Sequence, residues 1–176
     1  MLYTNISQMF ESKYGITSIV SERRSGMTTM LNEFIKKNIF DKKILVISCN
    51  KECAKKTCID VVGNKNIEYD SDKQLMHKLI NKDYDIIIYD TPDIFGKNIK
   101  ENINLLHGLK NTKIIVGITW EDLFNEKINK TIRNITDLCD ESFYFYITPY
   151  EKKPIINEIK KLTLSIWNII LSFFCF

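Results

Sequence analysis

The sequence predicts an α/β fold in three layers, in which a mostly parallel sheet is covered by helices on both faces. Apolar runs rich in branched residues recur along the chain, and stretches with helical spacing of apolar residues lie between them. The runs are nearly continuous instead of alternating, which is typical of strands buried on both faces. Because the carboxyl ends of parallel strands meet at one edge, we expect any ligand site there.

Each apolar run predicts one strand, and each stretch between runs predicts one helix. The strands cover Ile16–Val20, Lys43–Ser48, Asp85–Tyr89, Lys113–Ile118 and Phe143–Ile147. The helices cover Thr28–Ile39, Lys51–Val62, Ser71–Asn81, Lys97–Leu109 and Leu123–Leu138. Ser71 is a candidate N-cap for the third helix, because its hydroxyl can accept a hydrogen bond from the first turn.

Length and composition indicate one globular domain. The 176 residues are 44% hydrophobic and 27% charged, which is enough to bury a single core. A net charge of +3 is too small to predict nucleic-acid binding from bulk charge alone. The five cysteines form no C-x-x-C pair, which favours reduced, mostly buried thiols in an intracellular protein. The N-terminus lacks the pattern of a signal peptide, so secretion is not expected.

The sequence divides into a domain over residues 1–160 and an apolar tail over residues 161–176. Leu162–Phe176 contains no charged residue. As a helix it would extend about 22 Å at roughly 1.5 Å per residue, short of the roughly 30 Å hydrocarbon core. Asn168 also lies in its middle. We favour packing on the domain or on a continuation of the chain; a membrane anchor or membrane-surface segment is the alternative.

The segment SERRSGMTT, Ser21–Thr29, has the arrangement of a phosphate-binding loop between a strand and a helix. In G-x-x-x-x-G-K-[ST], backbone N–H groups hold the phosphates, the lysine contacts the β and γ phosphates, and the hydroxyl ligates Mg²⁺. On this template Gly26 is the second glycine, Ser21 replaces the first, Met27 replaces the lysine, and Thr28 supplies the metal-binding hydroxyl. The other candidate phosphate-binding residues are Glu22, Arg23, Arg24, Ser25 and Thr29.

The arginine pair can replace the charge of the missing lysine. A guanidinium group contacts phosphate with a bidentate fork, so Arg23 or Arg24 is a candidate to neutralise charge on a transferred phosphoryl group. The alternative is that both side chains belong to a solvated loop that binds no ligand.

YDIIIYDTPD, Tyr84–Asp93, is an apolar strand that ends in Asp90, which places a carboxylate where a P-loop enzyme holds Mg²⁺. Thr28 and Asp90 are therefore the candidate metal ligands, and ATP with Mg²⁺ is the candidate cofactor. Thr91 follows and cannot act as a general base near neutral pH. Asp93 is a candidate catalytic residue only if its loop bends back. Alternatively, Asp90 merely caps a loop.

These segments together resemble the ATPase domain of the large terminase subunit, the motor that packs DNA into viral capsids. The resemblance covers roughly residues 1–150, through the loop ERRSGMTT, KILVISCNKECAKKTCIDVV at 43–62, YDIIIYDTPDIF at 84–95 and KIIVGITWEDLFNE at 113–126. In that family the loop often reads S-R-Q-x-G-K-[ST]-T, and Arg23 falls on its arginine. Some members lack the lysine after the glycine and carry a basic residue earlier.

The resemblance implies a P-loop NTPase-type sandwich with ATP and Mg²⁺, and Thr119 as the residue that couples nucleotide state to motion. The partners it implies are double-stranded DNA, a viral portal or small terminase subunit, and further copies in a homo-oligomeric ring. It also implies a location in the host cytoplasm or nucleus.

Three departures from the family pattern keep other interpretations open. The family usually has Asp-Glu where Asp90 and Thr91 stand, Trp120 replaces the proline of the coupling motif, and the nuclease domain has no counterpart, so DNA cleavage is not expected. A catalytically inactive pseudo-ATPase, serving as a structural or interaction module and membrane-associated through its tail, is one alternative. A helicase-type accessory ATPase is another, although helicase loops normally keep the lysine.

For Trp120 and the aromatic residues at 143–146, core packing is favoured over base stacking.

Overall fold

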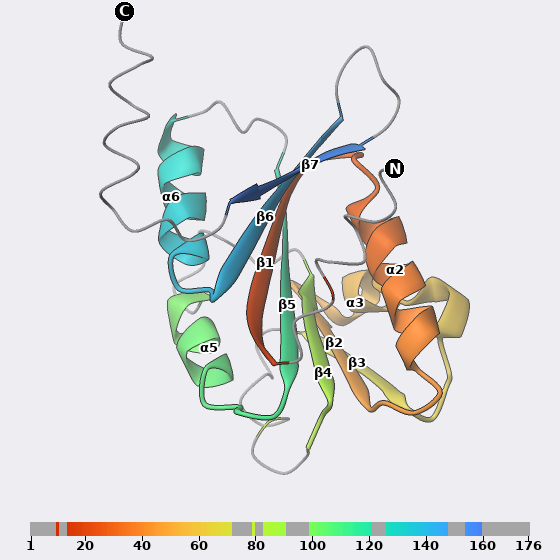
Figure 1. Ribbon diagram of the computed structural model, residues 1–176. Coiled ribbons are helices and arrows are strands. Elements are labelled where there is room, and N and C mark those ends of the chain that lie inside the picture. The colour runs from red at the N-terminus through yellow and green to blue at the C-terminus, as the bar shows by residue number, and fades with distance from the viewer. Residues whose placement is uncertain are drawn as a thin grey trace, which may run out of the picture.

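The computed structural model contains a seven-stranded sheet with helices on both of its faces (Figure 1). The structure describes residues 10, 14–71, 79, 83–90, 99–120, 126–147 and 154–159. Within these ranges, the side chains of 120, 145–147 and 154–159 are not described. The predicted α/β architecture in three layers is confirmed.

The sheet has the strand order β3-β2-β4-β5-β1-β6-β7. Its strands are β1 (Gly15–Glu22), β2 (Ile44–Ser48), β3 (Ile67–Ser71), β4 (Ile86–Asp90), β5 (Lys113–Trp120), β6 (Glu141–Ile147) and β7 (Pro154–Ile159). The pairs among β1 to β6 are all parallel, whereas β7 runs antiparallel to β6. The prediction of a mostly parallel sheet is therefore confirmed.

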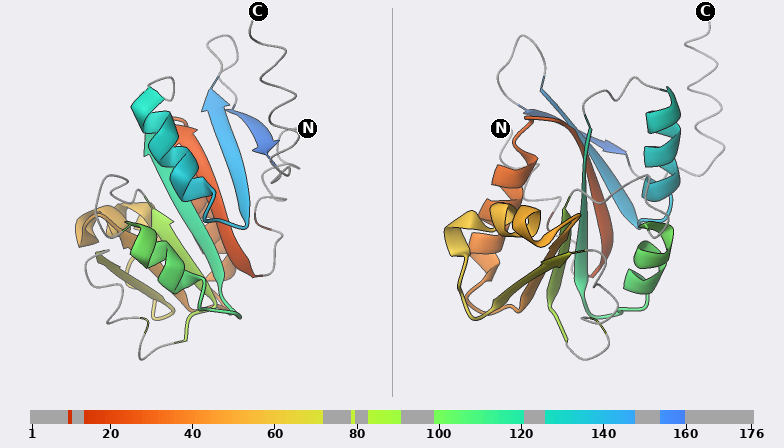
Figure 2. Two further views of the ribbon diagram at one scale, coloured as in Figure 1. Left: turned by 90° about the vertical axis from the view of Figure 1, so that its left-hand side faces the viewer. Right: turned by 180° about the vertical axis from the view of Figure 1, so that it is seen from behind.

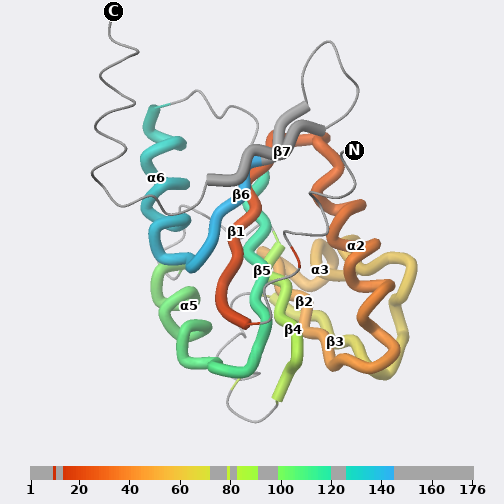
Figure 3. Tube along the Cα trace, viewed as in Figure 1, coloured from red at the N-terminus to blue at the C-terminus, as the bar shows by residue number. Residues whose placement is uncertain are grey.

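Helices α2 and α3 pack on one face of this sheet, and α5 and α6 pack on the other (Figure 2). The helices are α2 (Met27–Asn38), α3 (Lys51–Thr57), α5 (Ile99–Leu106) and α6 (Glu126–Thr136), and a short 3₁₀ turn, η1 (Ile59–Val61), follows α3. In the trace of Figure 3, β1, which lies between β5 and β6, leads directly into α2.

Two hydrophobic cores result from the alternation of side chains along the strands. On the α2 side, Ile19, Ile88 and Ile115 are buried against the helix, and on the α5 side Val20, Ile87 and Val116 are buried in the same way. Because both faces are covered, the central strands need apolar residues at almost every position. This requirement explains why they appear as continuous apolar runs in the sequence.

All five predicted strands are present, and the sequence analysis missed β3 and β7. The helix predicted over 51–62 ends at Thr57, where the chain changes to η1. Ser71 is the last residue of β3, and the helix predicted after it lies outside the described residues except for Leu79. The other three predicted helices are confirmed as α2, α5 and α6.

A polar contact joins the middle of α2 to η1. The Asn32 side-chain amide donates to a carboxylate oxygen of Asp60 at 2.7 Å, and the Lys36 ammonium lies 3.3 Å from the same oxygen. The hydrogen bond from Asn32, and then that from Lys36, lower the pKa of the Asp60 carboxyl. Because Asp60 is exposed, this contact serves mainly to orient η1 against α2.

In the part of the chain that the structure describes, no helix combines the length and the apolar character that crossing a bilayer requires. The tail over 161–176 lies outside that part, so its membrane and packing interpretations stay predictions.

Candidate functional site

The turn between β1 and α2 contains two residues with a left-handed backbone conformation, Arg24 and Gly26. The Ser25 N–H donates to the Glu22 carbonyl at 3.2 Å, and the Met30 N–H donates to the Gly26 carbonyl at 2.9 Å, which starts the helix. Gly26 has a φ of 91°, in the left-handed region that glycine adopts without strain. Arg24 has a φ of 67°, which costs a residue with a side chain about 1–3 kcal/mol. Backbone strain of this kind is common at functional sites.

There is space beside Gly26 at the start of α2. A Cβ atom added at Gly26 would meet no atom of the described residues within 4 Å, apart from its two chain neighbours. No side chain caps the helix at Gly26, and the first turn contains no acidic residue. The backbone N–H groups of a first helical turn and the helix dipole together attract anions. This turn therefore has the geometry and the electrostatics of an anion site.

The predicted loop residues divide by exposure. Ser21 and Ser25 are buried, Glu22 is half-buried, and the exposed residues are Arg23, Arg24, Gly26, Thr28 and Thr29. The Ser25 hydroxyl has no hydrogen-bond partner among the described residues. The two arginines and two threonines therefore lie on the outside of the turn, while the two serines lie within it.

Met27 occupies the lysine position of the template, and its side chain is only 3% exposed. It packs in the core on the α2 side, in the cluster that contains Leu31 and Phe34. The side chain at this position therefore contributes to the hydrophobic core, and only its backbone N–H belongs to the open turn.

Asp90 ends β4 and lies on the same face of the sheet as α2. It is in register with Gly117 of β5, which is in register with Ile19 of β1. A Cβ atom at Gly117 would lie 3.2 Å from Asp90 Oδ1 and 3.4 Å from Leu31 Cδ1. The carboxylate therefore lies over β5 beside α2, with one strand between it and the strand that leads into the loop. Both predicted parts of the site share one edge and one face of the sheet.

Thr57, at the end of α3, is a site residue that the sequence analysis missed. Its hydroxyl donates to Asp90 Oδ2 at 2.5 Å and lies 3.3 Å from the Cys53 carbonyl. Both Thr57 and Asp90 are buried, so this bond helps to satisfy a carboxylate that has little access to water. The sequence did contain one indication of this role. Thr57 lies with Ala54 and Cys58 on the buried side of the predicted helix, and a buried hydroxyl group needs a hydrogen-bond partner.

Thr119 lies on β5 in register with Ser21, and the two hydroxyl oxygens are 3.4 Å apart. This contact links the strand of the predicted coupling motif to the strand that enters the loop. The coupling role itself stays a prediction. Thr91 and Asp93 lie outside the described residues, and so does the side chain of Trp120.

Among the described residues, no group of three or more His, Cys, Asp or Glu side chains could hold a metal ion. A hydroxyl and a carboxylate nevertheless fit Mg²⁺, which prefers oxygen ligands and commonly takes the rest of its shell from water and phosphate. Thr28 and Asp90 remain the candidate ligands, in a site that a bound phosphate would complete.

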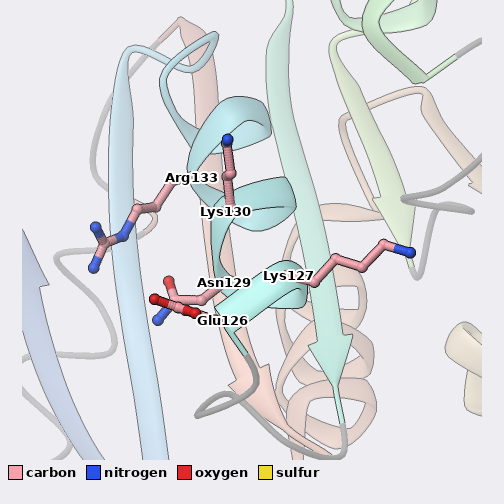
Figure 4. Close-up of a pocket in the computed structure, with 5 residues that line it drawn as sticks. All are labelled: Glu126, Lys127, Asn129, Lys130 and Arg133. Carbon is pink, nitrogen blue, oxygen red and sulfur yellow. The ribbon is translucent and has the colours of Figure 1, made fainter.

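A separate hollow of about 680 Å³ lies along the outside of α6 (Figure 4). The residues that line it are Glu126, Lys127, Asn129, Lys130 and Arg133. In Figure 4 the Lys127 and Arg133 side chains extend to different sides of the helix. Because α6 covers the face of the sheet opposite α2, this hollow is not part of the site at Gly26.

Comparison with known proteins identifies the fold and no family. No protein-family model and no curated protein sequence matches the chain. The flagellar accessory protein FlaH from Methanocaldococcus jannaschii is similar in structure, with a TM-score of 0.55, 10% sequence identity, and coverage of 89% of this chain and 84% of FlaH.

The VirB11 ATPase from the Brucella suis type IV secretion system, solved in complex with sulphate, is also similar in structure. The TM-score is 0.60 at 12% identity, over 98% of this chain and 55% of that one, so this chain spans about half the length of VirB11. The two likenesses confirm the predicted three-layer α/β fold, and they do not show a relationship to terminases.

Replacing Thr57 with valine should lower the free energy of unfolding by about 1–3 kcal/mol, because a buried carboxylate loses a hydrogen-bond donor. Urea denaturation measures the change. Thr57→Ser keeps the hydroxyl and should recover most of the loss. Equal stability of the valine variant and the unmodified protein would show that Asp90 does not depend on Thr57.

Proposed function

We propose that this chain binds ATP with Mg²⁺ at the open turn around Gly26. The observation that carries the proposal is an uncapped helix start behind a left-handed glycine, on the same face and edge of the sheet as the buried carboxylate of Asp90. Polyphosphates bind at helix starts of this kind. The structural likeness to VirB11, an ATPase solved with sulphate, supports the same assignment.

The roles of the residues follow from their positions. Backbone N–H groups at the start of α2, from Gly26 to Thr28, hold the phosphates, and the exposed guanidinium groups of Arg23 and Arg24 neutralise phosphate charge. The Thr28 hydroxyl and the Asp90 carboxylate are the protein ligands for Mg²⁺. Thr57 holds one oxygen of Asp90, and the space above Gly117 accommodates the other.

Hydrolysis should be slow or absent in this site. The lysine position is occupied by a core residue, Met27, and the residue after Asp90 is Thr91, which cannot activate water. A positioned general base typically contributes about 10²–10⁴-fold to the rate. The function that we favour is therefore a nucleotide-binding module of the pseudo-ATPase kind.

A terminase-like packaging motor is the second candidate, and the order of the sequence motifs favours it. The loop at 21–29, the acidic strand at 84–93 and the coupling strand at 113–120 follow one another as in that family, and the structure has a strand at each corresponding position. In this case double-stranded DNA, a portal or small terminase subunit, and copies of the chain in a ring are the partners.

Saturating Mg²⁺-ATP should raise the melting temperature of the protein, because a ligand at about 100 times its Kd stabilises the folded state by about 2.7 kcal/mol. Thr28→Ala should abolish most of the Mg²⁺-dependent part of the shift. Lys37→Ala, at another exposed position on α2, is the matched control and should leave it unchanged. The proposal is wrong if millimolar Mg²⁺-ATP produces no shift in the unmodified protein.

Met27→Lys should destabilise the protein by several kcal/mol, since an ammonium group would replace a thioether in the core. It should not create ATP turnover. Met27→Leu conserves volume and should cost less than about 1.5 kcal/mol. Denaturation and phosphate release measure the two effects. A stable Met27→Lys variant that hydrolyses ATP would contradict the assignment of this side chain to the core.

Double-stranded DNA separates the two candidate functions. A packaging motor should release phosphate faster when duplex DNA is added, and Asp90→Asn should remove that activity. The nucleotide-binding module that we favour should show no phosphate release above the level of an Asp90→Asn control, with or without DNA. DNA-stimulated turnover in the unmodified protein would replace our first proposal with the second.

A further inference from the structure

Two cysteines contact the same N-cap residue where β2 passes into α3. Cys49 follows the last residue of β2, Asn50 caps α3, and Cys53 is in the first turn of the helix. The Asn50 side chain accepts a hydrogen bond from the Cys53 N–H at 2.9 Å, while its amide lies 3.6 Å from Cys49 Sγ. The Asn50 side chain therefore contacts both cysteines, the sulfur of Cys49 and the backbone of Cys53, and holds them at the same helix start.

Cys49 and Cys53 differ from the other described cysteines in their exposure, contrary to the expectation of mostly buried thiols. Cys49 is exposed and Cys53 is half-buried, whereas Cys58 and Cys139 are fully buried. The Cys58 and Cys139 thiols contact backbone carbonyls of Ala54 and Ile135. Burial also raises the pKa of Cys58 to about 11, which suppresses its thiolate. A small oxidant in solution therefore reaches the first pair in preference to the second.

We propose that Cys49 and Cys53 are a redox modification site, which forms a reversible disulfide in the presence of a peroxide. The exposed sulfur of Cys49 attacks a peroxide oxygen, the O–O bond breaks, and a sulfenic acid forms with release of one water. The Cys53 sulfur then attacks that of Cys49, the S–O bond breaks, and a second water leaves. Two thiols lose two electrons and two protons, and the peroxide is reduced to two waters. A small-molecule dithiol reverses the reaction.

The chemistry of Cys49 suits a slow response to oxidant. Loss of water around its sulfur, and then the contact with Cys53, raise the pKa of the Cys49 thiol. At neutral pH this thiol is therefore mostly protonated, and protonated thiols react slowly. The pair should stay reduced under ordinary conditions and form its disulfide only under sustained exposure to peroxide.

The Thr57 side chain lies between this pair and the candidate metal site. The Thr57 hydroxyl lies 3.3 Å from the Cys53 carbonyl and donates to Asp90 Oδ2 at 2.5 Å. A covalent link between residues 49 and 53 constrains the first turn of α3, to which that carbonyl belongs. Oxidation should therefore change the environment of Asp90 through Thr57. Any effect on Mg²⁺-ATP rests in addition on the proposed nucleotide function.

Tryptic mapping tests the disulfide directly, because lysines separate the three neighbouring cysteines into different peptides. Cys49 falls in residues 44–51, Cys53 in 52–55 and Cys58 in 57–65. Dilute full-length protein is treated with hydrogen peroxide, alkylated, digested and analysed by mass spectrometry. We expect most of peptide 44–51 to be linked to 52–55, and the link to disappear with dithiothreitol.

Two variants sharpen this test. Cys49→Ser should remove the linked species, while Cys139→Ser, which changes a buried thiol, should leave it unchanged in protein that is still folded. If peptides 44–51 and 52–55 remain unlinked after peroxide, or if Cys49 links to Cys58 instead, the proposed site is wrong.

The connection to Asp90 has its own measurement, which requires no nucleotide. Amide hydrogen exchange over residues 86–90 should change by at least about twofold on oxidation of the unmodified protein and should not change in Thr57→Val. Unchanged exchange alongside a formed disulfide would disprove the connection and leave the redox site standing. Failure of Mg²⁺-ATP to bind would count against the nucleotide proposal alone.

Discussion

The register of β5 is the constraint on which the site depends. β1 and β4 do not pair with each other, and β5 holds them level, with Thr119 beside Ser21 and Gly117 beside Asp90. A shift of β5 by one residue would turn these positions to the opposite face of the sheet. Gly117 also lacks a side chain at the point where Asp90 and α2 converge. β5 supplies no predicted phosphate or metal ligand. Its register nevertheless determines whether the loop at Gly26 and the carboxylate of Asp90 can contact the same ligand.

The central part of the fold could be predicted because burial on both faces leaves a strong pattern. β2, β4 and β5 are apolar at most positions, and β1 contains the apolar residues Ile16, Ile19 and Val20, as expected for strands of a covered parallel sheet. β3 reads Ile-Glu-Tyr-Asp-Ser and lies at an edge, where polar residues are tolerated, so it leaves no such run. The helix after Asn50 is shorter than predicted. Ile59 and Val62 fit the helical period and therefore extend the predicted helix, but their side chains are 66% and 47% exposed in the structure.

The site could be predicted where chemistry restricts the residue type. Gly26 is required by a left-handed turn, and an aspartate at the end of a buried strand is rarely tolerated without a partner or a ligand. Thr57 and Gly117 could not be found in this way, because their importance comes from contacts with Asp90 across 33 and 27 positions of sequence. Met27 aligns with a lysine by position, but the direction of a side chain at a helix start is fixed by packing. Sequence spacing does not report that direction.

The reversed direction of β7 determines where the described part of the chain ends. Pro154 pairs with Ile147, at the end of β6 nearest the loop, and Ile159 pairs with Ser142, which is level with Ser18 in the middle of β1. The strand therefore runs from the level of the loop back to the middle of the sheet. A spectroscopic label placed at Ile159 would report on the flank of the sheet, at a different level from Gly26.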